Sequence, residues 1–122
     1  MRKHFMHLKE APFRQIWDGH KTIELRLYDE KRQLLQPGDW IEFDEMSVEN
    51  RKIVVEITAM HRFASFARLY DALPLHKCGY MPGESAHHTD MLAYYSAEEQ
   101  EKYGVVGIEF VVKERKGGVN EA

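Results

Sequence analysis

The sequence predicts an α+β fold, a mixed β-barrel with flanking short helices. Most periodic segments alternate apolar and polar residues at every second position, as strands do, and only two or three have helical spacing. Strands and helices do not alternate regularly, as a doubly wound parallel sheet requires. The 122 residues, 43% hydrophobic and 30% charged, have the size and composition of one globular domain. We therefore expect a single domain over residues 1–115 and a disordered tail over residues 116–122.

The N-terminal part predicts a short strand followed by a short helix. The strand lies around Phe5, and Pro12 suits the first turn of the helix. One apolar stripe at positions i, i+3 and i+4 is formed by Phe13, Ile16 and Trp17. Gly19 is a typical residue just beyond a helix C-terminus. Lys21 is therefore expected where the next strand begins, with its side chain able to turn toward Glu24.

Residues 22–28 predict a strand with two different faces. The apolar face, which suits a core, consists of Ile23, Leu25 and Leu27. The opposite face is polar, aromatic and charged, and consists of Thr22, Glu24, Arg26 and Tyr28. An exposed strand surface with an ordinary ion pair explains this second face. A ligand site explains it as well, because Arg26 offers a planar fork for a phosphate or carbonyl and Tyr28 offers a stacking face.

The middle of the chain predicts two strands and a covering helix. Pro37-Gly38 is a turn signal before a strand over residues 39–44. Glu49-Asn50 is expected to reverse the chain into the longest strand, residues 52–60. One face of that strand is buried and consists of Ile53, Val55 and Ile57. A short helix over one open end of the barrel is indicated by the spacing of Phe66, Leu69, Tyr70 and Leu73.

The C-terminal part predicts a loop, two short helices and a last strand. Residues 75–89 are irregular and rich in glycine and proline, which indicates a loop over the barrel. Residues 89–95 are expected to be helical, and the run Tyr94-Tyr95-Ser96 favours core residues with a helix cap over a base-stacking platform. Ser96 and Glu99 form a capping box for a helix over residues 97–103. The final strand is expected over residues 105–112.

Charge and composition limit the function. The net charge of -3 argues against a protein that binds nucleic acid through a broad basic surface. No apolar run approaches the roughly 20 residues that span a bilayer, and the N-terminus lacks the apolar stretch of a signal peptide. We therefore expect a cytoplasmic protein that does not bind membranes. Cys78 is the single cysteine, which agrees with a reducing compartment.

The run Gly19-x-Lys21-x-x-Glu24-x-Arg26 resembles the GxKxxExR signature of the ASCH domain family. The similarity extends to Gly38-Asp39-x-Ile41-x-Phe43 and to the segment from Tyr94-Tyr95-Ser96 to Ile108, so it covers roughly residues 5–112. The resemblance implies a PUA-like barrel and an association with RNA.

The resemblance also implies a ligand site at the motif. Lys21 and Glu24 are the candidate catalytic pair, and Arg26 is a candidate ligand contact. Four further residues are expected to contact the ligand, namely Thr22, Tyr28, Arg14 and Tyr95. The expected partner is RNA or a nucleoside, with one base or a short single-stranded segment held in a pocket.

One branch of the resembling family removes the acetyl group from N4-acetylcytidine. In that branch a lysine matches Lys21, a threonine nucleophile stands where this chain has Glu24, and a glutamate lies downstream, for which Glu84 is a candidate. A carboxylate can act as a general base for water, but as an acyl acceptor it would form an anhydride. Amide hydrolysis, RNA cleavage as in some bacterial members, and a purely interacting module therefore remain alternatives to RNA or nucleoside binding.

The histidines do not predict a metal site. His76, Cys78, His87 and His88 have a spacing that matches no structural zinc pattern, and adjacent histidines in a loop usually point apart. We expect neither a metal nor a cofactor.

Overall fold

The fold is built on one five-stranded sheet in the order β1-β3-β4-β5-β2. The computed structural model describes residues 1–45 and 51–117. The strands are β1 (Lys3–Leu8), β2 (Ile23–Leu27), β3 (Trp40–Glu45), β4 (Lys52–Phe63) and β5 (Val105–Lys116). The α-helices are α1 (Glu10–Trp17), α2 (Phe66–Ala72) and α3 (Ala97–Tyr103), and the short 3-10 helices are η1 (Arg32–Leu34), η2 (Leu75–Cys78) and η3 (His88–Ala93).

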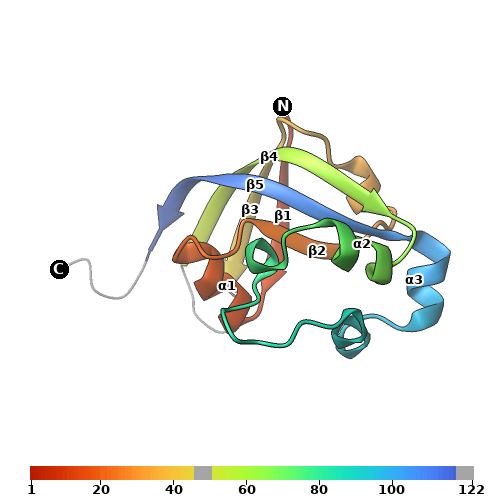
Figure 1. Ribbon diagram of the computed structural model, residues 1–122. Helices are drawn as coiled ribbons and strands as arrows, with labels where there is room; N and C mark the ends of the chain where they lie inside the picture. The colour runs from red at the N-terminus through yellow and green to blue at the C-terminus, as the bar shows by residue number, and fades with distance from the viewer. Residues whose placement is uncertain (46–50, 118–122) are drawn as a thin grey trace.

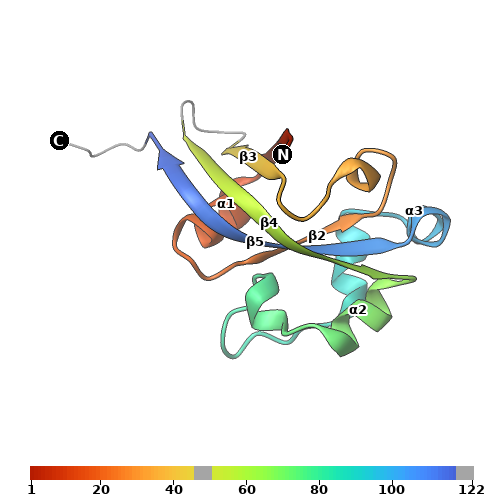
Figure 2. The same cartoon turned by 90° about the horizontal axis from the view of Figure 1, so that it is seen from above.

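The sheet curls into a barrel that its backbone ladder does not close. β1 pairs in parallel with β3, whereas the β3/β4, β4/β5 and β5/β2 pairs are antiparallel. β1 and β2 are the two edges of the sheet. The long strands β4 and β5 run side by side along one side of the molecule, and α1 and the chain from α2 to η3 lie on the other (Figures 1 and 2). The opening between the two edge strands holds the cavity that is the candidate functional site.

Two groups of buried apolar side chains hold the fold together. The larger one fills the barrel and includes Phe13 and Ile16 of α1 with residues of β3, β4 and β5. The smaller one packs the apolar face of β2 against α2, η2 and η3 through Ile23, Leu25, Leu27, Phe66, Leu69, Cys78 and Met91. The predicted alternation of β2 is therefore confirmed, and its polar residues face away from this smaller core toward the opening between β1 and β2.

The predicted elements are present, with corrections at their ends. β4 continues to Phe63 because its last residues still pair with β5. The predicted helix over residues 89–95 is the 3-10 helix η3, and the capping box of Ser96 and Glu99 is confirmed. β5 continues to Lys116, which pairs with Lys52, so this residue lies in the sheet rather than in the predicted tail. Residues 118–122 of that tail and the predicted reversal at Glu49-Asn50 lie outside the described residues.

Candidate functional site

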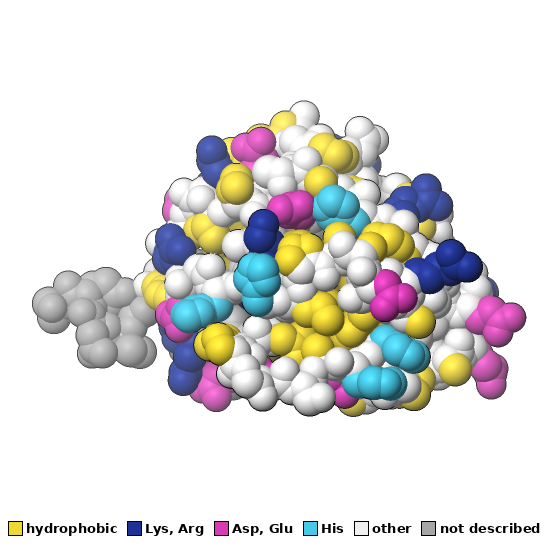
Figure 3. All heavy atoms as spheres, viewed as in Figure 1, with side chains coloured by type: hydrophobic (Ala, Val, Ile, Leu, Met, Phe, Trp, Pro, Cys, Tyr) yellow, Lys and Arg dark blue, Asp and Glu magenta, His cyan; other side chains and the backbone are white. Residues whose placement is uncertain are grey.

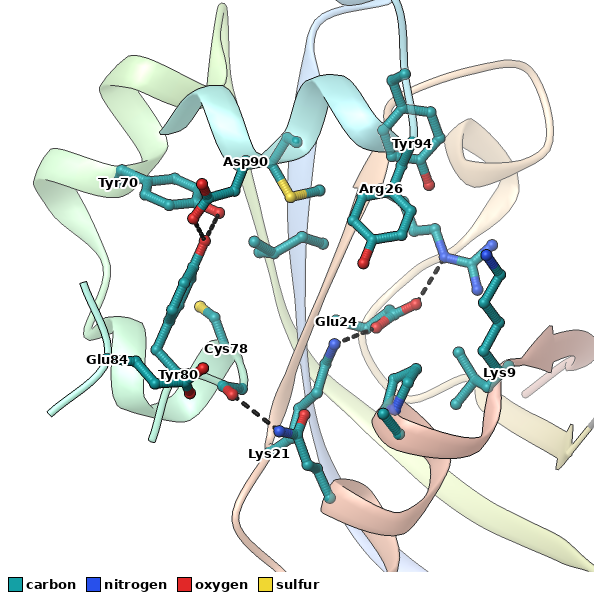
Figure 4. A pocket seen from close by; sticks show the side chains of 18 of the residues that line it. Lys9, Lys21, Glu24, Arg26, Tyr70, Cys78, Tyr80, Glu84, Asp90 and Tyr94 are labelled. Carbon is teal, nitrogen blue, oxygen red and sulfur yellow. Dashed lines mark hydrogen bonds and ion pairs between the residues drawn. The ribbon is translucent and has the colours of Figure 1, made fainter. Parts of the chain in front are cut away.

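A cavity of about 520 Å³ lies at the opening between β1 and β2. Four parts of the chain line it: the junction of β1 with α1, the residues from Lys21 to Arg26 before and along β2, Tyr70 of α2, and the segment from η2 through η3 to Tyr95 (Figure 4). Buried lining residues such as Lys21, Glu24 and Cys78 form its floor, and exposed ones such as Lys9 and Tyr94 form its rim. The GxKxxExR motif therefore lies inside a concave site rather than on a convex surface.

Three charged side chains of the motif form a buried network on the cavity floor. Lys21 Nζ lies 2.9 Å from Glu24 Oε1, and Arg26 Nε lies 2.7 Å from Glu24 Oε2. Lys21 is 9% exposed and Glu24 is 5% exposed. Arg26 Nη2 also donates a hydrogen bond to the carbonyl oxygen of His7 at 3.2 Å. The Arg26 side chain thus connects β2 to β1, the two edge strands that the sheet itself does not pair.

The network carries a net positive charge. Burial acts to raise the pKa of Glu24, but the ion pairs with Lys21 and Arg26 outweigh it, so this pKa is lowered and the carboxyl is ionised. Burial acts to lower the pKa of Arg26, but the ion pair and hydrogen bond with Glu24 outweigh the effect of burial, so the pKa is raised. Two cations therefore share one anion, which makes the floor attractive to a carbonyl or an anionic oxygen of a ligand.

The backbone after α1 directs Lys21 into the cavity. The carbonyl oxygen of Gln15 accepts hydrogen bonds from the N–H groups of His20 and Lys21, at 2.9 and 3.1 Å. The side-chain Nε2 of Gln15 donates to the carbonyl oxygen of Gly79 at 3.0 Å. Gly79 has a φ of +111°, and a Cβ there would lie 2.8 Å from Gln15 Oε1. This turn explains why Lys21 meets Glu24 in spite of the odd spacing between them.

Tyrosines form the walls of the cavity. Tyr80 donates a hydrogen bond to Asp90 Oδ2 at 2.7 Å, and its hydroxyl lies 2.7 Å from that of Tyr70. Burial and these two hydrogen bonds raise the pKa of Tyr80, so its phenol stays protonated. Tyr95 stacks on Phe66 of the smaller core, with ring centroids 6.2 Å apart. Fixed aromatic faces therefore surround the charged floor.

The structure brings only part of the predicted site together. Lys21, Glu24, Arg26, Tyr95 and the candidate downstream glutamate, Glu84, all line the cavity.

The other three predicted contacts lie elsewhere. The N–H of Thr22 donates to the carbonyl oxygen of Lys77, and its own carbonyl accepts from Phe110, which fixes it outside the lining. Tyr28 follows the last residue of β2 and lines a separate hollow. The Arg62 guanidinium carbon lies there over the Tyr28 ring, 4.1 Å from the ring centroid. The Arg14 side chain is 62% exposed and pairs with Glu10. The positions of these residues do not support them as contacts of a ligand in this cavity.

Several lining residues were not predicted from the sequence. Gln15, Tyr70, Tyr80 and Asp90 belong to the site, but no motif marks them. Tyr94 was interpreted as a core residue, and this is wrong, because it is 63% exposed.

The described residues show neither a metal-ligand cluster nor a membrane-spanning helix. Among residues 1–45 and 51–117, no three His, Cys, Asp or Glu side chains are grouped as a metal site requires. His87 and His88 stack on each other with ring centroids 4.8 Å apart. None of the helices that the structure describes is long and apolar enough to cross a membrane.

Comparison with known proteins identifies the family. A model described as the ASCH domain matches residues 6–114. The chain belongs to the ASCH domain family. This ASCH protein is similar to the crystal structure of hypothetical protein PH0355, with a TM-score of 0.77 and 31% identity over 91% of this chain and 99% of the other. It is also similar to the solution NMR structure of protein PF0455 from Pyrococcus furiosus, with a TM-score of 0.69 and 31% identity over 90% of this chain and 96% of the other.

The comparison confirms the predicted PUA-like α+β fold. No curated protein sequence matched. The family is associated with RNA in general terms.

Proposed function

We propose that this ASCH protein binds RNA through one unpaired base, or binds a modified nucleoside, in the cavity above Lys21, Glu24 and Arg26. The observation that carries the proposal is the buried, net positive network on the floor of a cavity with tyrosine walls. The volume of this cavity, about 520 Å³, is within the range of small-ligand sites, about 300–1,000 Å³.

The lining residues supply the contacts that a base needs. Lys21 has N–H donors beyond the one directed at Glu24, and they suit a base carbonyl. Each Glu24 oxygen accepts one charged donor and keeps a second lone pair for an N–H of the ligand. Tyr80 and Tyr95 offer ring surfaces for apolar contact or stacking with a base. A base has this combination of carbonyl, N–H and flat aromatic surface.

The molecular surface favours a local site over a long RNA track. On the face shown in Figure 3, Lys and Arg side chains lie among acidic residues and histidines rather than in one continuous patch. The net charge of -3 agrees with this distribution. We therefore expect a shallow salt dependence, because few phosphates are contacted.

Titration with short single-stranded RNA and with nucleosides, acetylated cytidine included, tests the proposal. Lys21→Ala and Arg26→Ala are each expected to weaken binding about tenfold or more, since a hydrogen bond to a charged group contributes about 1.5–3 kcal/mol. Arg14→Ala is the control, because that side chain is exposed and lies outside the cavity. Thermal melting of each variant shows whether it is folded. Equal affinities for the wild type and both cavity variants would overturn the proposal.

Hydrolysis of an amide such as that of N4-acetylcytidine is the second candidate function. The observation that favours it is that Lys21 and two carboxylates, Glu24 and Glu84, line one cavity. Thr22 lies outside, so water is the nucleophile: it adds to the acetyl carbonyl, whose oxygen accepts a hydrogen bond from Lys21. A carboxylate takes the proton of the water, and the amine of cytidine leaves with a proton as acetate forms. Glu84 suits the base better than Glu24, because Glu24 is held by two cations that lower its pKa.

Release of acetate and cytidine is the measurement for this second function. Turnover that is lost in Lys21→Ala and in Glu84→Gln supports it, whereas no product at high protein concentration refutes it. Electrophoresis of RNA after the same incubation tests cleavage, the remaining enzymatic alternative.

A further inference from the structure

The rim of the cavity is different on its two sides. Lys9 and Tyr94 lie on one side, and Tyr80, Glu84 and Asp90 lie on the other (Figure 4). The first side presents a cation beside an aromatic ring, and the second presents two exposed carboxyl groups. A phosphate at the cavity mouth is therefore attracted to the first side and repelled by the second.

Tyr94 is exposed beside the cavity and is connected to it by aromatic contacts. Tyr94 as a whole is 63% exposed, and Lys9 Nζ lies 6.0 Å from its ring centroid. The ring also lies next to that of Tyr95, with centroids 6.5 Å apart, and Tyr95 in turn stacks on Phe66. A row of aromatic rings thus leads from the smaller core past the cavity to the surface, and the outermost ring has a cation within reach.

We propose that the occupant of this site is an unpaired nucleotide inside an RNA strand rather than a free nucleoside. The base enters the cavity, the neighbouring base stacks on Tyr94, and Lys9 binds the phosphate between them. This inference rests on the proposed function, and it adds a second contact position for which a free nucleoside has no group.

The chemistry of the rim supports a strand that leaves by this side. An exposed aromatic face with a nearby cation is the usual means of holding consecutive bases of a single strand. The opposite side is unsuitable for the phosphates of a strand, because the exposed carboxylate of Asp90 repels them. This carboxylate also already accepts the hydroxyl hydrogen of Tyr80. One phosphate contact through Lys9 predicts a slope of about -0.7 for the logarithm of the binding constant against that of the salt concentration.

The test compares short single-stranded RNA homopolymers with the corresponding free nucleosides, each titrated into the full chain. Tyr94→Ala is expected to weaken RNA binding about tenfold, as loss of one stacked base does, and to leave nucleoside affinity unchanged. Tyr94→Phe should keep the wild-type affinity for RNA, because the ring is retained. Lys9→Ala should weaken RNA binding and reduce the salt slope, again without an effect on the nucleoside.

Lys102→Ala is the matched control. Its ammonium lies 5.0 Å from the Tyr103 ring centroid on α3, in a similar lysine–tyrosine pair that does not line the cavity. This variant should bind RNA as the wild type does.

Two kinds of result would overturn the inference, and they are distinguishable. If RNA and nucleoside both depend on Lys21 but neither responds to Tyr94→Ala or Lys9→Ala, the cavity binds a base and the second position is absent. If neither ligand binds, or if Lys21→Ala has no effect on either, the proposed function fails and this inference fails with it.

Discussion

Replacement of Glu24 by glutamine should destabilise the protein strongly. Glu24 is the shared partner of Lys21 at 2.9 Å and of Arg26 at 2.7 Å, and all three side chains are largely buried. Glutamine has the same shape but no charge, so two cations stay close together without their counter-ion. Breaking a buried ion pair in this way costs about 3–5 kcal/mol, a large part of the roughly 5–15 kcal/mol that stabilises a domain.

Thermal and urea unfolding measure this cost. At about 4 °C per kcal/mol for a domain of this size, Glu24→Gln should lower the melting temperature by roughly 12–20 °C. Glu10→Gln is the control, since the Glu10–Arg14 pair is exposed at both ends and should change the stability by less than about 1 kcal/mol. A Glu24→Gln variant within about 0.5 kcal/mol of the wild type would refute the buried network.

Glu24, Gly79 and Cys78 each give the site a property that can be measured separately. The pKa of Glu24 is lower in the folded state than in the unfolded state. The contribution of its carboxylate to the folded protein is therefore complete above the ordinary carboxyl pKa and is lost as pH falls through the lowered value. Urea unfolding at a series of pH values should show the free energy of unfolding of the wild type approaching that of Glu24→Gln in acid. Gly79→Ala should lower the free energy of unfolding by at least about 1–2 kcal/mol through the left-handed backbone alone. It should also weaken ligand binding, since a Cβ at this position would lie 2.8 Å from Gln15 Oε1 and 3.5 Å from Lys21 Cδ. Wild-type affinity in this variant would contradict the role of that turn. Burial raises the pKa of Cys78 to about 11, so iodoacetamide at pH 8 should modify it much more slowly in the folded protein than in urea, and rapid modification of the folded protein would contradict its burial.

The sequence was sufficient to find the charged floor of the cavity. The alternation of residues 23–27 separates Glu24 and Arg26 from the apolar face of β2, and the end of α1 explains how Lys21 joins them. Alternation applies only within a strand, however. Thr22 precedes β2 and Tyr28 follows it, so the period of two did not place their side chains correctly.

The walls and rim of the cavity could not be predicted from local patterns. Gln15 and Gly79 are separated by 64 residues but share a hydrogen bond, and the pairing of Tyr80 with Asp90 depends on the path of an irregular loop. Tyr94 follows a 3-10 helix, where neither the helical nor the strand period decides which side chain is buried. These positions are set by tertiary contacts rather than by local sequence preference.

A residue-resolved NMR titration with short single-stranded RNA tests the central claim most directly. The cavity binds the base in our account, so the largest shift changes are predicted at Lys21, Tyr80 and Tyr95, with smaller ones at the rim. Changes confined to the separate hollow of Tyr28 and Arg62, or no changes at saturating RNA, would contradict it.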